Sequence, residues 1–367
     1  MKPTRPYLSV IVPVYQGEKV LPLSLGALTL STLPRDSWEL IVVDDASTDD
    51  TAMLAANYAD TVVRLPGKPH GPAYARNRGF EVARGEVVVF VDADACVHAD
   101  VLARFAVLFA SEADVSAAFG SYDSAPSDTG FISQYRNLLH HYHHQNNPGD
   151  AQTFWAGCGA IRSEVFASAG MYDEWHFPRP QIEDIELGHR IRALGKRIVL
   201  RPEIQCAHLK RWTFRGMIVT DLTDRGVPWA RLLVAQGATL KSKSLNLKTM
   251  EKINTVLVWS ALFFVLAALV FRRSQLLFGA LDCLMPVLFI NRPLYAFFER
   301  VRGFWFAFRV VPLHVLYYLL NGVAAGFGWL LHETIGEPHP DPTVQAFSEI
   351  GIKTWPPVPV NRGTGQW

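Results

Sequence analysis

The sequence predicts an α/β fold, with a mostly parallel sheet covered by helices on both faces and transmembrane helices after it. Over roughly the first 210 residues, short β-branched segments alternate with helical ones, which is typical of doubly wound parallel sheets. In the last third, long apolar segments replace that alternation. We therefore expect an α/β domain at 1–240, a membrane module of two or three helices at 241–335 and an irregular tail at 336–367.

The expected elements follow from residue type and from the residues that separate them. Runs of Val and Ile mark buried strands, and Ser, Thr and Asp before a longer segment mark the start of a helix. In chain order we expect strands at 8–15, 40–43, 61–65 and 87–91, and helices at 53–58, at 73–83, from 131 and at 182–194.

Carboxylates follow two of these strands. The all-apolar segment 87–91 runs directly into Asp92 and Asp94. The segment 40–43 likewise runs into the pair Asp44-Asp45. Because open α/β sheets bind ligands beyond the carboxyl ends of their strands, this pattern predicts a crevice for a nucleotide and a cation. Two oxygen ligands suit Mg²⁺ or Mn²⁺ that bridges to a diphosphate. The alternative is an ordinary Asp-rich turn.

Four motifs in this order resemble those of the family 2 glycosyltransferases, which have the GT-A fold. They are Val10–Tyr15, Ile41–Asp49, Gly71–Gly79 and Phe90–Asp94, and the resemblance covers roughly residues 7–210. The resemblance implies an inverting enzyme that takes a sugar from a nucleotide-diphosphate donor, usually a UDP-sugar. It also implies a divalent cation, Mg²⁺ or Mn²⁺, as cofactor.

The resemblance also assigns residues to the donor site. The nucleotide-sugar positions are Pro13, Tyr15, Glu18, Asp45, Arg76 and Asp92. The first three match positions that border the base and ribose, and Asp45 matches the carboxylate that accepts a hydrogen bond from the base. Arg76 matches a basic residue near the diphosphate, and Asp94 matches the direct metal ligand, with Asp92 toward the ribose and a metal-bound water. Taken singly, each has another explanation, such as a strand end, a helix cap or a solvated side chain.

A second acidic motif, Gln181–Arg190, opens the helix expected at 182–194. Carboxylates in a first turn are stabilised by the helix dipole even without a chemical role. The motif nevertheless resembles the Glu-Asp motif of the family, which makes Asp184 the general base and Glu183 a contact to the acceptor. A hydroxyl acceptor needs such a base, whereas a phosphate acceptor is already anionic. The motif therefore favours a hydroxyl.

Two further segments are candidates for the substrate site. Trp155 and Gly157 lie in a glycine-rich segment that the family uses around the donor sugar and acceptor, and with Trp212 they are the expected substrate wall. His208 and Arg211 lie where some membrane glycosyltransferases carry Gln-x-x-Arg-Trp. We expect His208 to contact the metal or the diphosphate and Arg211 to neutralise the departing diphosphate. The change from Gln to His leaves processive synthesis open.

The histidines of 140–144 have no role in this scheme. His140 and His144 are four residues apart on the helix expected from 131 and share one face. No third ligand completes a zinc motif, so solvated or interfacial histidines are the better explanation, with contact to an anionic headgroup as an alternative.

Three C-terminal segments are long and apolar: 253–271, 274–291 and 310–331. The first has no charged residue and is long enough to span a bilayer. Basic residues before the first segment and between the second and third place the α/β domain in the cytoplasm. We expect an integral protein of the plasma (inner) membrane, with interfacial helices at 211–240.

Composition excludes some classes of function. A net charge of +1 gives no case for nucleic acid as a partner. Four cysteines without a Cys-x-x-Cys pair indicate a reducing compartment. The first residues lack the apolar region of a signal peptide, so we expect none.

The interpretation with most support is transfer of a sugar from a nucleotide-sugar donor to a hydroxyl of a lipid or lipid-linked saccharide. A polyprenyl-phosphate glycosyltransferase is the alternative within the family. A nucleotidyltransferase is the alternative from another class, since it shares the sheet and the metal carboxylates but releases pyrophosphate. A non-catalytic membrane scaffold has no use for three acidic motifs.

Overall fold

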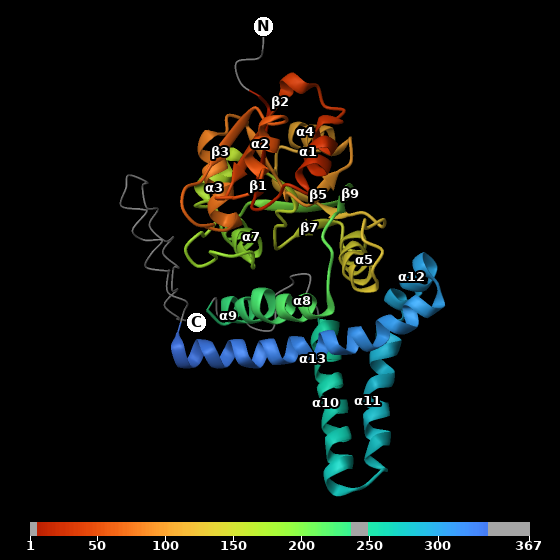
Figure 1. The fold of residues 1–367 in the computed structure, drawn as a ribbon. Coiled ribbons are helices and arrows are strands. Elements are labelled where there is room, and N and C mark those ends of the chain that lie inside the picture. The colour runs from red at the N-terminus through yellow and green to blue at the C-terminus, as the bar shows by residue number, and fades with distance from the viewer. Residues whose placement is uncertain (1–5, 236–248, 337–367) are drawn as a thin grey trace.

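The computed structural model describes residues 6–235 and 249–336 (Figure 1). Its strands are β1 (Leu8–Val14), β2 (Trp38–Asp44), β3 (Thr61–Arg64), β4 (Val87–Val91), β5 (Ala95–Val97), β6 (Val115–Tyr122), β7 (Gly149–Ala151), β8 (Cys158–Arg162) and β9 (Arg197–His208). Helices of the same region are α1 (Leu21–Thr29), α2 (Thr51–Ala56), α3 (Pro72–Val82), α4 (Val101–Ser111), α5 (Phe131–Gln145), α6 (Ser163–Ser168) and α7 (Glu183–Ala193). The strands and helices predicted from the sequence are present, with ends that differ by a few residues.

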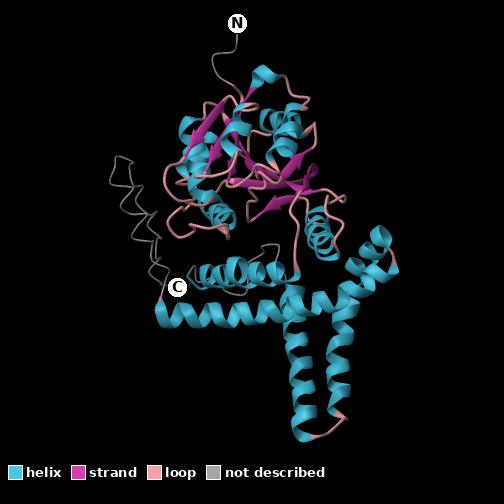
Figure 2. Ribbon diagram, in the orientation of Figure 1, coloured by secondary structure: helices cyan, strands magenta, loops and turns pink. Residues whose placement is uncertain are grey.

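Helices cover both faces of the sheet because its strands are apolar on both sides. Alternate residues of a strand point to opposite faces. In β1, Val10 and Val12 therefore belong to a buried cluster with α1 and α4, whereas Ile11 belongs to another with α3, α6 and α7. Figure 2 shows this layered α/β part at one end of the molecule.

The sheet is mixed rather than mostly parallel. Its order is β3-β2-β1-β4-β8-β6-β9-β5, with β7 paired to β9. The four strands predicted from β-branched runs, β1 to β4, pair in parallel. β8 then lies antiparallel between β4 and β6. The sequence between β4 and β8 is too irregular in period for this change of direction to be predicted.

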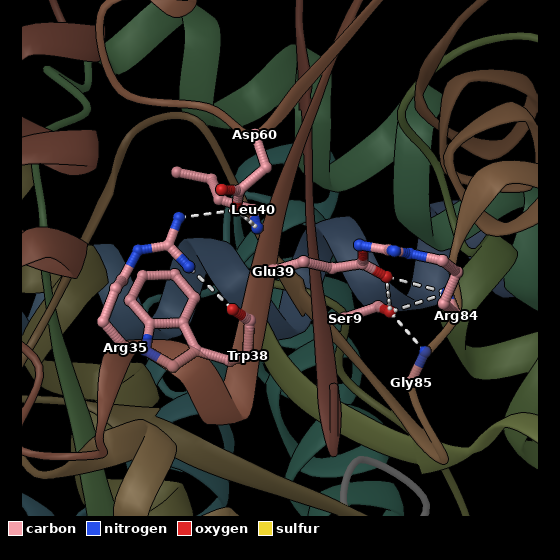
Figure 3. Close-up of polar contacts among 8 residues, drawn as sticks. All are labelled: Ser9, Arg35, Trp38, Glu39, Leu40, Asp60, Arg84 and Gly85. Atoms are coloured by element: carbon pink, nitrogen blue, oxygen red, sulfur yellow. Dashed lines mark hydrogen bonds and ion pairs between the residues drawn. The ribbon is translucent and has the colours of Figure 1, made fainter. Parts of the chain in front are cut away.

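A polar cluster closes the amino-terminal edge of β1 and β2 (Figure 3). Glu39 on β2 is buried, and its Oε1 accepts hydrogen bonds from Ser9 Oγ at 2.6 Å and from the Arg84 amide at 2.8 Å. Its Oε2 accepts from Arg84 Nε and NH2 at 2.9 and 2.6 Å. Gly85 donates to Ser9 Oγ at 2.7 Å. Asp60 likewise accepts from the Leu40 amide, so both strand starts are tied to neighbouring loops.

The C-terminal part is helical. It consists of α8 (Phe214–Val219), a π-helical segment (Thr220–Gly226), α9 (Val227–Ala235), α10 (Thr249–Phe271), α11 (Leu276–Ile290), α12 (Arg292–Arg302) and α13 (Phe304–Ile335). Within the described residues, α10 and α13 are each long and apolar enough to cross a membrane, and α11 with α12, bent by 62°, forms a third candidate. The expected two or three apolar helices are therefore present. The expected tail at 336–367 lies, apart from Gly336, outside the described residues.

Candidate active site

The loops that follow the parallel strands carry the predicted acidic residues to one edge of the sheet. β1, β2 and β4 are adjacent and parallel, so their carboxyl ends meet at that edge. Pro13 is buried near the end of β1, and Tyr15, the next residue after that strand, is 51% exposed. Asp45 follows β2, and Asp92 follows β4.

Arg76 joins the two predicted acidic motifs. Its guanidinium lies on α3, and NH2 donates to Asp92 Oδ1 at 2.7 Å while NH1 donates to Glu183 Oε1 at 3.0 Å. The side chain is 4% exposed and also lies over the ring of Tyr172 at 5.3 Å. Burial alone lowers the pKa of Arg76, but Asp92, Tyr172 and Glu183 together raise it. Arg76 is therefore a permanent cation that joins Asp92 to Glu183, a residue 107 positions from Arg76 in the sequence.

Asp184 is the carboxylate whose protonation is most affected by its surroundings. It lies in the first turn of α7, and Oδ2 accepts from the Ala156 amide at 3.3 Å. Burial, with a smaller effect of Glu183, raises the pKa of Asp184 to about 7, while Arg76 and Arg225 oppose that change. A carboxylate with a pKa near the working pH suits proton abstraction.

Asp94 and His208 form the second acidic centre. His208, the last residue of β9, lies with Nε2 3.4 Å from Asp94 Oδ2, and its Nδ1 lies 2.7 Å from the carboxamide oxygen of the buried Asn137. The Tyr122 ring stacks on His208 at 4.3 Å. Burial raises the pKa of Asp94, but the hydrogen bond and charge of His208, with the charge of Lys210, lower it below its ordinary value.

The donor set of this centre fits a divalent cation. Nδ1–H of His208 donates to the carboxamide oxygen of Asn137, which leaves Nε2 as the ring nitrogen that faces the Asp94 carboxylate. With Nε2 unprotonated, that nitrogen and the carboxylate can both serve as ligands of one cation. Within the described ranges, no three His, Cys, Asp or Glu side chains form a complete metal site. The residues therefore fit an Mg²⁺ or Mn²⁺ that takes its other ligands from water and substrate.

Asp45 has backbone partners in the structure. It is buried, and its carboxylate accepts from the His70 amide at 2.9 Å and the Gly71 amide at 2.7 Å. Gly71 has φ +96°, and a Cβ there would lie 2.3 Å from the Pro178 carbonyl oxygen. Asp45 thus fixes the loop before α3 and Arg76. Its contact with a base, like that of Glu18, stays a prediction.

The expected substrate wall is a packed aromatic group. Trp155 contacts the Tyr122 ring at 4.8 Å and the His140 ring at 4.9 Å. A Cβ at Gly157 would lie 2.5 Å from the Trp155 ring, so only glycine allows the indole to lie there. Trp212 is elsewhere, packed with α5 and α12, and Lys210 lies over its ring at 4.3 Å.

Two cationic side chains that the sequence analysis did not assign, Lys210 and Arg225, act on the predicted acidic residues. The predicted cation Arg211 does not contact them. The Arg211 side chain is 83% exposed, and its Nε lies 3.9 Å from Asp128. The charge of its neighbour Lys210 acts on Asp94, and that of Arg225, in the π-helical segment, acts on Asp184. The adjacency of Lys210 to His208 was a usable signal, but nothing in the sequence pointed to Arg225.

The histidines of 140–144 are part of the α5 packing rather than a solvated surface. His144 Nδ1 lies 2.9 Å from the Gly120 carbonyl and His141 Nδ1 lies 2.7 Å from the Tyr122 carbonyl, both at the end of β6. Burial lowers the pKa of His144 to about 3 and that of His140 well below its usual value, so both rings are neutral near pH 7. The expectation of solvated or interfacial histidines was wrong for this pair, because α5 packs on β6, the strand before it in the sequence, and covers both rings.

Comparison with known proteins finds a family model that matches the sheet domain and solved structures of similar fold. Residues 9–169 match the model of Glycosyl transferase family 2. A poly(ribitol-phosphate) beta-glucosyltransferase of Bacillus spizizenii is 31% identical over 103 residues, 27% of this chain and 16% of the relative. The UDP-Glc:alpha-D-GlcNAc-diphosphoundecaprenol beta-1,3-glucosyltransferase WfgD of Escherichia coli is 32% identical over 89 residues, 24% of this chain and 34% of the relative. Matches of this kind cover 16% to 40% of the length of the curated relatives.

The solved mannosyltransferase PcManGT from Pyrobaculum calidifontis, in complex with GDP-Man and Mn²⁺, has a similar fold. It superposes with a TM-score of 0.54 at 20% identity and covers 88% of this chain and 87% of its own. The family match and this likeness confirm the predicted GT-A class of the sheet domain.

Proposed function

We propose, on the premise that residues 9–169 of this chain belong to glycosyl transferase family 2, that the protein transfers a sugar from a nucleotide-diphosphate donor to a hydroxyl group. We take the donor to be a UDP-sugar and the acceptor to be a lipid or lipid-linked saccharide at the cytoplasmic membrane face. The anomeric centre is inverted. The observation that carries this proposal is Asp184, a carboxylate with a pKa of about 7 beside the Arg76 bridge to Asp92.

Asp184 acts as the general base. A sugar or lipid hydroxyl becomes a good nucleophile only when its proton is removed during attack. The raised pKa gives Asp184 enough basicity for that step and still leaves about half of it ionised near pH 7. Glu183 is held by Arg76 and by the Gln181 amide at 2.9 Å. It keeps α7 in place and contributes to the acceptor side.

The leaving diphosphate is stabilised on the other side of Arg76. Asp94 and His208 would hold a divalent cation, and Arg76 fixes the neighbouring Asp92. When bound, that cation neutralises charge on the diphosphate as it leaves. Lys210 adds a positive charge next to Asp94. We keep Pro13, Tyr15, Glu18 and Asp45 as the border of the nucleotide, and Trp155 and Gly157 as the wall beside the sugar.

A lipid-linked acceptor fits the long apolar helices. α10 and α13 are suited to membrane association by length and hydropathy, and the relative WfgD is named for a diphosphoundecaprenol acceptor. We propose that residues 241–335 hold the protein on the membrane from which the acceptor is presented. The division at residue 240 is part of this proposal.

The test is transfer by membranes that contain the full chain, incubated with a panel of nucleotide sugars and examined by mass spectrometry. We expect one product that is lost with EDTA and with Asp94→Ala, and weakened by Asp92→Ala. The exposed Asp36→Ala serves as a matched control that leaves transfer unchanged. Release of pyrophosphate in place of a nucleoside diphosphate would identify a nucleotidyltransferase, and EDTA-insensitive turnover in Asp94→Ala would contradict the metal site.

A further inference from the structure

Helix α13 is long enough to cross a bilayer, yet both of its ends contact parts of the chain that are tied to the catalytic domain. Its 32 residues span about 48 Å at 1.5 Å per residue. A hydrocarbon core is about 30 Å thick, so a crossing helix of this length would place its two ends on opposite sides. We propose that α13 lies in the plane of the membrane surface, with one face on the catalytic domain and the opposite face in lipid.

The N-terminal end of α13 packs on α5 of the catalytic domain. The Phe306 ring lies 5.0 Å from the Phe131 ring, and the Arg309 guanidinium lies 3.9 Å above that same ring. Ala307 and Val310 are buried in a cluster with residues of α5 and α12. This end of α13 is therefore held on the same side as α5.

The C-terminal end of α13 packs on α9 and the π-helical segment. A Cβ at Gly328 would lie 2.5 Å from the Ala230 Cβ, so the two helices are in close contact. The last carbonyl of the described chain, that of Gly336, accepts from Arg231 NH2 at 2.6 Å. α13 thus runs along α9 at this end, as Figure 1 shows.

Ion pairs fix α9 and the π-helical segment to the catalytic domain. Asp221 pairs with Arg136 of α5 at 2.7 Å, with both side chains about 90% buried. Asp224 lies 3.6 Å from Arg179, in the loop before α7. Because these helices also continue directly from β9, they lie on the domain side. Both ends of α13 are consequently on that side.

The opposite face of α13 is apolar and exposed toward both ends of the helix. Its side chains include Phe304 at 58%, Trp305 at 73%, Phe308 at 61%, Phe327 at 51% and Leu330 at 48% exposure. Phe304 and Phe308 are four positions apart and Phe327 and Leu330 three, whereas Ala307, Val310, Ala324 and Gly328 form the buried face. The buried face is covered by α5, α12 and α9, so only the exposed apolar face is left to contact lipid.

The hairpin of α10 and α11 identifies lipid as the occupant of that face. Tyr318, in the middle of α13, accepts from Asn254 of α10 at 3.0 Å and donates to Asn291, at the end of α11, at 3.2 Å. From there the hairpin extends away from the catalytic domain and from α13 (Figure 1). The most apolar stretch of α10 has a mean hydropathy of 2.3. The lipid that surrounds the hairpin therefore begins at the exposed face of α13.

Depth measurement tests the proposal without reference to transfer. Val323→Cys places a thiol on the exposed face near the middle of α13, where the valine is 44% exposed. The full chain, labelled there with a fluorophore, is reconstituted in vesicles with lipids that carry a nitroxide either near the headgroup or near the chain end. We expect the shallow nitroxide to quench more strongly. Stronger quenching by the deep nitroxide would show that α13 crosses, and no quenching by either would show that protein or water covers this face.

Labelling of the two ends gives an independent result. Glu299→Cys and Glu333→Cys place exposed thiols before and near the end of α13, and Lys196→Cys marks the catalytic domain. The unsubstituted protein gives the background from its own four cysteines. A membrane-impermeant maleimide applied to sealed vesicles should reach all three positions from one side. Reaction of Glu333→Cys from the side opposite to Lys196→Cys would overturn the proposal.

Discussion

Buried carboxylates at the two edges of the sheet differ in their hydrogen-bond and ion-pair partners. At the amino-terminal edge, both oxygens of Glu39 accept hydrogen bonds from Ser9 and Arg84, and the cluster is closed by Gly85 (Figure 3). At the carboxyl-terminal edge, a single buried guanidinium, Arg76, serves both Asp92 and Glu183. Asp184 next to them has a pKa of about 7.

This difference distinguishes carboxylates that stabilise the fold from carboxylates that are suited to take part in a reaction. A carboxylate with a complete set of donors is stabilised as an anion and has little tendency to take a proton. A carboxylate that shares its cations and is partly desolvated keeps its basicity, at a cost in stability. The parallel strands bring the two kinds of group to opposite ends of the same core. Four substitutions or conditions test whether this comparison is right.

Asp184→Asn should have the largest effect, on turnover alone. The change keeps the shape but removes the base, and general bases contribute roughly 10²- to 10⁴-fold to kcat. Nucleotide affinity should change little, because Asp184 belongs to the acceptor side in the proposed mechanism. Turnover and calorimetric nucleotide binding are measured on one preparation, with Glu164→Gln, an exposed first-turn carboxylate of α6, as the matched control.

Two results would contradict the role given to Asp184. Retained turnover in Asp184→Asn would favour a phosphate acceptor, as in a polyprenyl-phosphate glycosyltransferase. Lost nucleotide binding would show that the first turn of α7 supports the fold rather than the acceptor.

Asn137→Ala should weaken metal binding. The carboxamide orients His208 through a 2.7 Å contact, and removing such a partner typically reduces metal affinity about 10- to 100-fold. Mn²⁺ binding is followed by electron paramagnetic resonance in the presence of UDP. Asn146→Ala, at the exposed end of the same helix, is the control and should bind Mn²⁺ normally. Unchanged affinity in Asn137→Ala would remove His208 from the proposed metal site.

Glu39→Gln should destabilise the protein without changing the chemistry of the site. The substitution weakens charge-assisted hydrogen bonds to Ser9 and Arg84 in a buried setting, and we expect a loss of about 1–3 kcal/mol in the free energy of unfolding. Chemical denaturation in detergent measures it, with the exposed Glu203→Gln as control. A larger effect on kcat than on unfolding would mean that the two edges are not independent.

The pH dependence tests the same comparison through the protonation of Asp184. The folded-state pKa of Asp184 is raised to about 7 from 3.8, so the folded protein disfavours its ionised form. The contribution of this group to stability is therefore present below about pH 4 and is lost as the pH rises toward 7. Between about pH 4 and 7, the melting temperature of the wild type should fall relative to that of Asp184→Asn. Above about pH 7, the two melting temperatures should change in parallel. The kcat of the wild type should rise over the same interval, with an apparent pKa that belongs to the Glu183–Asp184 pair. A flat kcat profile between pH 5 and 8 would contradict the proposed base.

The sequence by itself determined the elements that depend on local composition. An all-apolar run such as 87–91 is typical of a strand that lies between other strands and under helices. All four predicted strands, β1 to β4, are present and pair in parallel with one another. The acidic residues at the strand ends follow from the same pattern, because the carboxyl ends of parallel strands meet. The length and apolarity of α10 and α13 were also readable without a structure.

Only the tertiary structure decided which distant groups share a charge or a hydrogen bond. Arg76 pairs with Glu183, His208 with Asn137, and the buried histidines of α5 with carbonyls of β6. The direction of β8 and the course of α13 along α9 were decided in the same way. The physical reason is that local patterns report which faces of a segment are apolar. Contacts between different elements depend on how those faces pack, and hydropathy alone does not distinguish a helix that crosses lipid from one that lies on it.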